Sequence, residues 1–257
     1  MSTQSSRAAQ FRELHGGPPF ILANAWNETS ARRLAAMGFR AIGTTSAGVA
    51  LDHGLCDGEV SREEMLAVCG RIARSVDLPV SADLSNGFGE SPDDCASTIR
   101  EAIALGLAGG SIEDSTADPH HPVYPFELAV ERVRAAMAAI RESGRDFVLT
   151  ARAENHLHGV HDLEDTIARM TAFAAEGADV LFAPGLPDLA AVRKVRERIE
   201  RPLNVIVGYK GCPYTIPELI DIGVNRISVG AALAREPADQ LESAARRLLE
   251  WEQEART

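Results

Sequence analysis

The chain of 257 residues has little cysteine and a deficit of positive charge, and each shortage argues against a class of protein. Its four cysteines are scattered and include no CxxC pair, so a disulfide framework is not expected. The 26 Lys and Arg residues are outnumbered by 37 Asp and Glu residues, which leaves a formal net charge of −11. This balance argues against sequence-independent binding of nucleic acid, because such binding needs many cations that face phosphates.

Long apolar runs are also absent. No run approaches the roughly 18 apolar residues that cross a bilayer, and the N-terminal residues lack the apolar stretch of a secretory signal. The overall composition, with 45% apolar and 25% charged residues, is ordinary for a globular protein. We therefore expect a cytoplasmic protein that binds neither nucleic acid nor membrane.

What the chain does contain is one repeating pattern: a short apolar run, a polar or glycine break, and a helical stretch rich in Ala, Leu and Arg. The apolar runs lack polar alternation, as expected of parallel strands that are buried on both faces. The eight predicted strands are Phe20–Ala25, Ala41–Thr45, Pro79–Asp83, Gly109–Glu113, Phe147–Arg152, Ala178–Ala183, Leu203–Gly208 and Arg226–Val229.

Eight strand–helix units predict an α/β fold, a single (β/α)8 barrel of the TIM type, as one domain over residues 1–257. A doubly wound sheet is the alternative. We disfavour it because no GxGxxG or GxxxxGK[ST] loop follows any predicted strand. Met1–Pro18 is expected to be a polar lead-in with a short helix, and Ala232–Ala255 a long closing helix.

In such a barrel the carboxyl ends of the strands meet at one mouth, where the active site is assembled. Three carboxylates, Asp57, Asp83 and Glu113, end or follow three different predicted strands. Hard oxygen ligands with room for waters suit Mg²⁺ or Mn²⁺. The three acids therefore predict a divalent metal site at the mouth.

Other residues at the same strand ends predict an anionic substrate. Arg152 ends the fifth strand and could fork onto a carboxylate. The turn Ser46-Ala47-Gly48 offers backbone N–H groups and a hydroxyl to an anion, and Trp26 is expected to form a wall of the pocket. Together with the metal, these residues indicate a site for an α-oxo or α-hydroxy carboxylate. There the metal would stabilise an enolate formed when a bond β to the carbonyl breaks.

At these positions the sequence resembles the isocitrate lyase/phosphoenolpyruvate mutase superfamily, in six motifs that follow one another along nearly the whole chain. The matching segments are Asn24-Ala25-Trp26-Asn27, Thr45-Ser46-Ala47-Gly48-Val49-Ala50, Gly54-Leu55-Cys56-Asp57, residues 79–89 with Asp83 in a P-x-x-x-D motif, Ile112-Glu113-Asp114, and Ala151-Arg152-Ala153-Glu154.

The resemblance implies a role for each matching position. Asp83 would bind Mg²⁺ directly and face the substrate, while Asp57 and Glu113 would orient metal-bound waters. Asn204 would add a polar contact at the end of the seventh strand. The substrate's carboxylate and enolate oxygens would be held by Ser46, Ala47, Gly48 and Arg152. The resemblance also implies small α-oxo acid substrates and a homotetramer, a dimer of dimers in which paired subunits exchange the eighth helix.

The sequence departs from the family at positions that set the reaction. Lyases of the family carry a K-[KR]-C-G-H loop after the fourth strand, and phosphonate-processing members a Lys-Asp-Asn loop; residues 115–124 contain neither. Ser85 replaces the second acid of the D-x-[DE] motif, and Pro184 replaces a catalytic His or Glu. We therefore expect neither (methyl)isocitrate lyase nor mutase activity, and His120 is a candidate proton donor in place of the loop cysteine.

These observations predict a Mg²⁺-dependent carbon–carbon (or carbon–phosphorus) lyase. It would act on a small α-oxo (di)carboxylate through a metal-bound enolate, by decarboxylation or retro-aldol cleavage. Two alternatives stay open. The departures at Ser85 and Pro184 favour a catalytically silent α-keto-acid binding protein. Lys210, after the seventh strand, could instead form a Schiff base with a keto acid, as in an aldolase.

Overall fold

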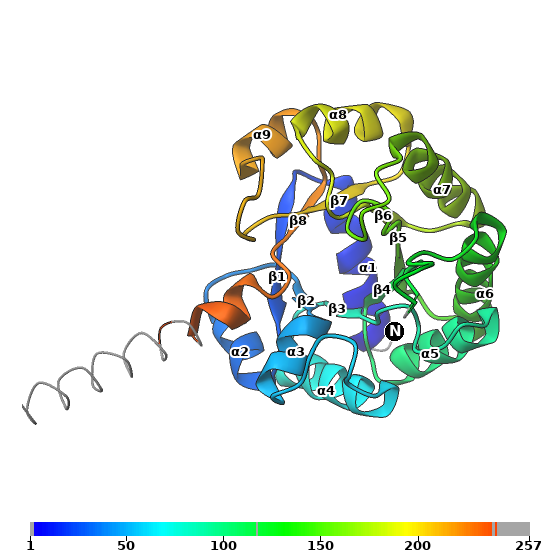
Figure 1. Ribbon diagram of the computed structural model, residues 1–257. Helices are drawn as coiled ribbons and strands as arrows, with labels where there is room; N and C mark the ends of the chain where they lie inside the picture. The colour runs from blue at the N-terminus through cyan, green and yellow to red at the C-terminus, as the bar shows by residue number, and fades with distance from the viewer. Residues whose placement is uncertain (1–2, 117, 238–239, 241–257) are drawn as a thin grey trace, which may run out of the picture.

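The computed structural model describes residues 3–116, 118–237 and 240. Its parallel strands pair in chain order and close into a barrel where β8 pairs with β1, with helices around the outside (Figure 1). This confirms the predicted (β/α)8 barrel, and each strand lies within two residues of its predicted bounds. The strands are β1 (Phe20–Ala25), β2 (Ile42–Thr44), β3 (Val80–Asp83), β4 (Gly109–Glu113), β5 (Val148–Arg152), β6 (Val180–Phe182), β7 (Leu203–Ile206) and β8 (Arg226–Ser228).

Helices separate the strands and begin at the caps that the sequence supplies. At the start of α5, the Ser91 hydroxyl accepts from the Asp94 N–H at 3.2 Å, and the Asp94 carboxylate accepts from the Ser91 N–H at 2.9 Å. Gly177 ends α7 in the left-handed conformation, with φ of 109°. The helices are α1 (Thr3–Gly16), α2 (Glu28–Ala36), α3 (Ser46–Asp52), α4 (Arg62–Ser75), α5 (Pro92–Ala104), α6 (Phe126–Ser143), α7 (Leu163–Glu176), α8 (Leu189–Arg198) and α9 (Ile216–Asp221).

The N-terminal helix α1 closes one end of the barrel. In Figure 1 it lies across the ring of strands, whereas the other labelled helices surround that ring. Its Ala8 and Phe11 are fully buried in an apolar cluster with residues at the starts of strands, among them Phe20 and Val148. A Cβ on Gly109 would lie 2.6 Å from the Val148 carbonyl oxygen and 3.0 Å from the Phe11 ring, so only glycine permits this close approach. The segment expected to be a polar lead-in with a short helix is therefore a helix that closes this end of the barrel, which we call the barrel floor.

At the other terminus, residues 232–237 are helical. They begin the predicted closing helix Ala232–Ala255, most of which lies outside the described residues. Among the described residues, no helix has the length and apolar character that crossing a membrane requires.

Candidate active site

Two adjoining cavities lie at the carboxyl ends of the strands. The first, which we call the barrel cavity, has a volume of about 310 Å³ and extends between the strands. The second, the mouth cavity, has a volume of about 820 Å³ and is lined by the loops that follow β2, β3, β4 and β5. Both cavities are lined by Ser46, Asp57, Arg152 and Leu157, so they lie side by side at the mouth of the barrel. This is the end of a barrel at which active sites are built.

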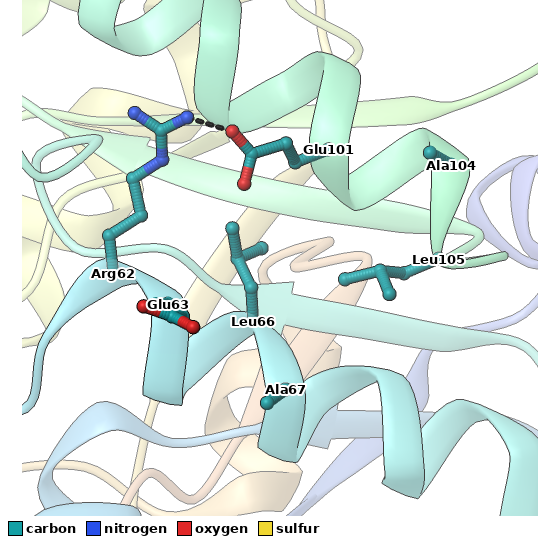
Figure 2. A pocket seen from close by; sticks show the side chains of 7 residues that line it. All are labelled: Arg62, Glu63, Leu66, Ala67, Glu101, Ala104 and Leu105. Carbon is teal, nitrogen blue, oxygen red and sulfur yellow. Dashed lines mark hydrogen bonds and ion pairs between the residues drawn. The ribbon is translucent and has the colours of Figure 1, made fainter.

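A third hollow, of about 640 Å³, lies outside the barrel between α4 and α5 (Figure 2). Leu66 and Leu105 give it an apolar base, and the ion pair between Arg62 and Glu101 spans it. No strand end contributes to this groove, and its acids Glu63 and Glu101 are exposed, while Arg62 is half-buried. It lacks the convergent polar groups of a catalytic site.

Arg152 lies at the centre of the charged groups in the two cavities. Its guanidinium contacts three carboxylates: Nη1 lies 3.1 Å from Asp83 Oδ1, Nη2 lies 3.1 Å from Glu113 Oε2, and Nε lies 2.8 Å from Glu154 Oε1. The Phe182 ring packs against it, with Arg152 Cζ 5.1 Å from the ring centroid. The strand register brings these groups together, because Glu113 of β4 pairs directly with Arg152 of β5.

Burial and mutual repulsion shift the pKa values of these groups. Burial raises the pKa of Glu113 to about 7, against the opposing charge of Arg152, and the nearby Glu154 and Asp83 carboxylates raise it further. Burial likewise raises the pKa of Glu154. Burial alone would lower the pKa of Arg152, but the charges of Glu113, Glu154 and Asp83 hold it above its ordinary value. A cluster of this kind in a cavity is typical of functional sites.

Arg152 contacts acids of the protein itself, and its expected role as a substrate clamp stays a prediction. All three of its nitrogens already face protein carboxylates, so the guanidinium serves here as their counter-charge. Glu154, which our candidate set omitted, is the third partner. The A-R-x-[DE] motif was the sequence signal that could have identified it. One of its oxygens, Oε2, is buried without a hydrogen-bond partner among the described residues.

Asp83 is held from two sides, and this changes the interpretation of the Ser46-Ala47-Gly48 turn. The Asp83 N–H donates to Thr44 Oγ1 at 2.8 Å, while its Oδ2 accepts from the Ser46 N–H at 3.0 Å. The predicted tight turn is the first turn of α3, capped by Thr45. The Ser46 N–H donates to Asp83, and the expected role of the turn in binding a substrate anion stays a prediction.

The remaining candidates divide between those that reach the cavities and those that do not. Asp57, on an exposed loop, lines both cavities, and Ala47 and Asn204 line the barrel cavity. Trp26 instead packs beside Gly48, where an added Cβ would lie 3.2 Å from Trp26 Cβ. Neither Trp26 nor Gly48 is among the cavity-lining residues.

Residues 115–124, which stand where lyases of the family carry the cysteine loop, form a short connection that is held by hydrogen bonds between its own two ends. Ser115 and Val123 form an antiparallel bridge, and the Thr116 N–H donates to the Pro122 carbonyl at 2.9 Å. His120 is exposed on this connection and lines neither cavity, so its role as proton donor stays a prediction. Lys210 is also exposed and lines neither cavity.

The three acids that were predicted to bind a metal, Asp57, Asp83 and Glu113, line the barrel cavity or the mouth cavity, but their side chains are not grouped around one point. Among the described residues, no three His, Cys, Asp or Glu side chains lie together as a metal site. Asp83 and Glu113 each accept contacts from Arg152 on one oxygen and from a neighbouring donor on the other, Ser46 N–H and Ser115 Oγ respectively. A donor set of carboxylates around an open space fits Mg²⁺, which keeps several of its waters.

Comparisons with known proteins show to which family the chain belongs. The family model described as phosphoenolpyruvate phosphomutase matches residues 11–249. The 2-methylisocitrate lyase of Shewanella oneidensis is 31% identical over 209 residues, which is 78% of this chain and 70% of that protein.

Solved structures show the same relationship. A Burkholderia cenocepacia protein described as a lyase/mutase superposes with a TM-score of 0.93 at 44% identity, covering 96% of this chain and 88% of that chain. The structure of oxaloacetate acetylhydrolase in complex with its product oxalate superposes with a TM-score of 0.85 at 26% identity. The match covers 94% of this chain and 86% of that chain. The chain therefore belongs to the phosphoenolpyruvate phosphomutase family of the isocitrate lyase/phosphoenolpyruvate mutase superfamily, whose members are carbon–carbon or carbon–phosphorus lyases and mutases.

Proposed function

We propose that this protein is a lyase that breaks a carbon–carbon bond of a small α-oxo dicarboxylate by decarboxylation or retro-aldol cleavage. The electron pair of the broken bond is left on the carbon next to the carbonyl, as an enolate, and a proton donor then converts the enolate to the keto acid. The observation that carries the proposal is the barrel cavity, which is lined by Asp83 and Arg152 and lies beside the mouth cavity. The volume of the barrel cavity, about 310 Å³, suits a small acid.

Cations along this space supply the affinity for a substrate with two carboxylates. Arg235 lines the barrel cavity and forms no ion pair with any described residue, so its guanidinium is available to a carboxylate. Arg152 balances the acids at the cavity wall and keeps them from repelling the substrate. Ser46 and Asn204 add polar contacts from the first turn of α3 and from β7.

A divalent cation completes the proposed site. Asp83 would hold Mg²⁺ directly, with Asp57 and Glu113 acting through water, and Mn²⁺ suits the same oxygen donors. When bound, the cation supplies positive charge that stabilises the enolate. Glu113, whose pKa is raised to about 7, exchanges protons readily near neutral pH.

A catalytically silent keto-acid binding protein is the second candidate. Ser85, which lies where relatives carry a second acid, lines the mouth cavity and adds no charge there. Pro184 is buried after β6 and provides no proton-transfer group. A Schiff-base aldolase is less favoured, because Lys210 is exposed and lines neither cavity.

Calorimetry with oxalate, with and without Mg²⁺, tests the proposal. Oxalate is a planar dianion that imitates a pyruvate enolate, so a site built for that intermediate should bind it tightly. We expect Mg²⁺-dependent binding in the wild type and its loss in Asp83→Ala and in the isosteric Asp83→Asn. The control is Asp221→Ala, which removes an exposed acid at the end of α9 and should bind as the wild type.

Unchanged Mg²⁺-dependent binding in both Asp83 variants would contradict the metal assignment. Where oxalate binds, turnover of oxaloacetate and other α-oxo dicarboxylates separates the two candidates. Product formation above a metal-only background supports the lyase, and tight binding without turnover supports the binding protein.

A further inference from the structure

Arg226 carries a buried positive charge that no described acid balances. It begins β8, is only 3% exposed, and its side chain crosses the interior of the barrel. Nε donates to Asn204 Oδ1 of β7 at 2.8 Å, and Nη2 donates to Thr150 Oγ1 of β5 at 3.0 Å. Nη1 lies 3.3 Å from Nε2 of His15, on the helix that closes the barrel floor. Each of these partners is a neutral group, provided that His15 is unprotonated.

His15 is held in its neutral form. Burial, and then the charge of Arg226, lowers the pKa of His15 to about 3. Its Nδ1 lies 2.7 Å from the Phe11 carbonyl, which can only accept, so Nδ1 carries the proton and donates. Nε2 is then the lone pair that accepts from Arg226. The barrel floor therefore positions the guanidinium without neutralising it.

The guanidinium in turn decides which way the Asn204 amide points. Arginine has donors and no acceptor, so the Asn204 atom that faces it must be the oxygen. The amide nitrogen consequently points to Ser228, whose Oγ it contacts at 3.0 Å. Because Ser228 Oγ accepts this bond, its hydroxyl hydrogen is available to a ligand. Both Asn204 and Ser228 line the barrel cavity, as Arg226 itself does.

An unbalanced buried charge is costly, because the protein interior solvates it poorly. That cost falls when a bound anion supplies the missing counter-charge. The donors of Asn204 and Ser228, directed by Arg226, match the oxygens of a carboxylate or an enolate. An anion with two negative charges gains about twice the Coulomb energy of one with a single charge at the same distance.

We propose that Arg226 is a positioning residue of the barrel cavity. It directs Asn204 and Ser228 to present hydrogen-bond donors to the barrel cavity and gives the cavity a positive potential. This potential selects doubly charged anions over singly charged ones. The inference rests on the function proposed above, because it assigns this selectivity to the same cavity.

The test compares two ligands of nearly equal shape in the presence of Mg²⁺: oxalate, a dianion, and oxamate, a monoanion. Arg226→Met keeps the length of the side chain and removes its charge and donors. We expect it to weaken oxalate binding at least tenfold and oxamate binding about threefold or less. Arg226→Lys, which keeps the charge, should restore part of the oxalate preference. Arg40→Met, which removes an exposed arginine beside Phe20, is the control and should leave both affinities unchanged.

Two results would overturn the inference: wild-type affinities for both ligands in Arg226→Met, or an equal loss for both that leaves the preference intact. Failure of the wild type to bind oxalate would instead contradict the proposed function. A crystal structure of Arg226→Met then decides the positioning role. We expect the Asn204–Ser228 hydrogen bond to be lost there, and its retention would overturn the proposal.

Discussion

Two arginines of one barrel, Arg152 and Arg226, have opposite surroundings. Arg152, at the end of β5, contacts three carboxylates, whereas Arg226, at the start of β8, contacts only neutral groups. The acids raise the pKa of Arg152, while burial lowers the pKa of Arg226 to about 9, which still leaves it charged at neutral pH. The comparison teaches that one residue type serves two purposes: Arg152 balances charge within the protein, and Arg226 keeps charge available for a ligand.

The largest expected effect is on stability when each arginine is replaced by methionine. Arg152→Met leaves three carboxylates in the cavity wall without their counter-charge, and we expect it to lower the free energy of unfolding by about 3–5 kcal/mol. Arg226→Met removes an unbalanced charge but leaves Asn204 Oδ1 without its donor. These two effects oppose each other, so we expect Arg226→Met to change the free energy of unfolding by less than about 2 kcal/mol.

Urea unfolding at neutral pH without added metal measures both variants. A similar loss in the two would mean that the surroundings of the arginines do not set their roles, and the comparison would break down.

An intermediate effect is expected in the pH dependence of stability. The folded pKa of His15, about 3, lies below its ordinary value of 6.5, mainly through burial and then through the charges of Arg226 and Arg12. As the pH falls, His15 is therefore protonated in the unfolded chain before it is protonated in the folded chain. The contribution of neutral His15 to the free energy of unfolding is fully present above pH 6.5 and declines as the pH falls toward 3. Between pH 7 and pH 5 it amounts to about 2 kcal/mol.

His15→Gln should remove this part of the pH dependence, which urea unfolding at pH 7 and pH 5 would measure. The exposed His120→Gln is the control and should keep the wild-type difference between the two pH values. If His15→Gln keeps that difference as well, the imidazole is not held neutral beside Arg226. The inference that His15 accepts a hydrogen bond from the Arg226 guanidinium would then be wrong.

The smallest effects come from two hydroxyls, one beside each arginine site. Thr150→Val preserves shape but removes the acceptor of Arg226 Nη2, and we expect a loss of about 1–2 kcal/mol in the free energy of unfolding. Ser111→Ala removes a hydroxyl 3.5 Å from Asp83, near the limit of a hydrogen bond, and we expect about 0.5 kcal/mol or less. Thermal or urea unfolding of both variants checks the order. The reverse order would show that the floor contacts of Arg226 are weak.

Much of the charged cluster was predictable from strand ends alone. Asp83, Glu113 and Arg152 each end a buried apolar run, and parallel strands bring such ends to one mouth. The contribution of Glu154 was harder to foresee, because it follows the strand and its contact with Arg152 depends on the direction of a loop side chain. The same limit applies to the Ser46 N–H, which a sequence pattern assigns to an anion without showing that Asp83 is that anion.

The sequence by itself determined the eight strands, the closed barrel and the end at which acids and arginine meet, because apolar runs, caps and glycine stops act over a few residues. Only the tertiary structure decided what lies inside. Arg226 reaches His15 across 211 residues of chain and Thr150 across 76. Those contacts exist because closure places β8 beside β1 and α1 across the floor, and no local pattern records which side chains then meet in the centre.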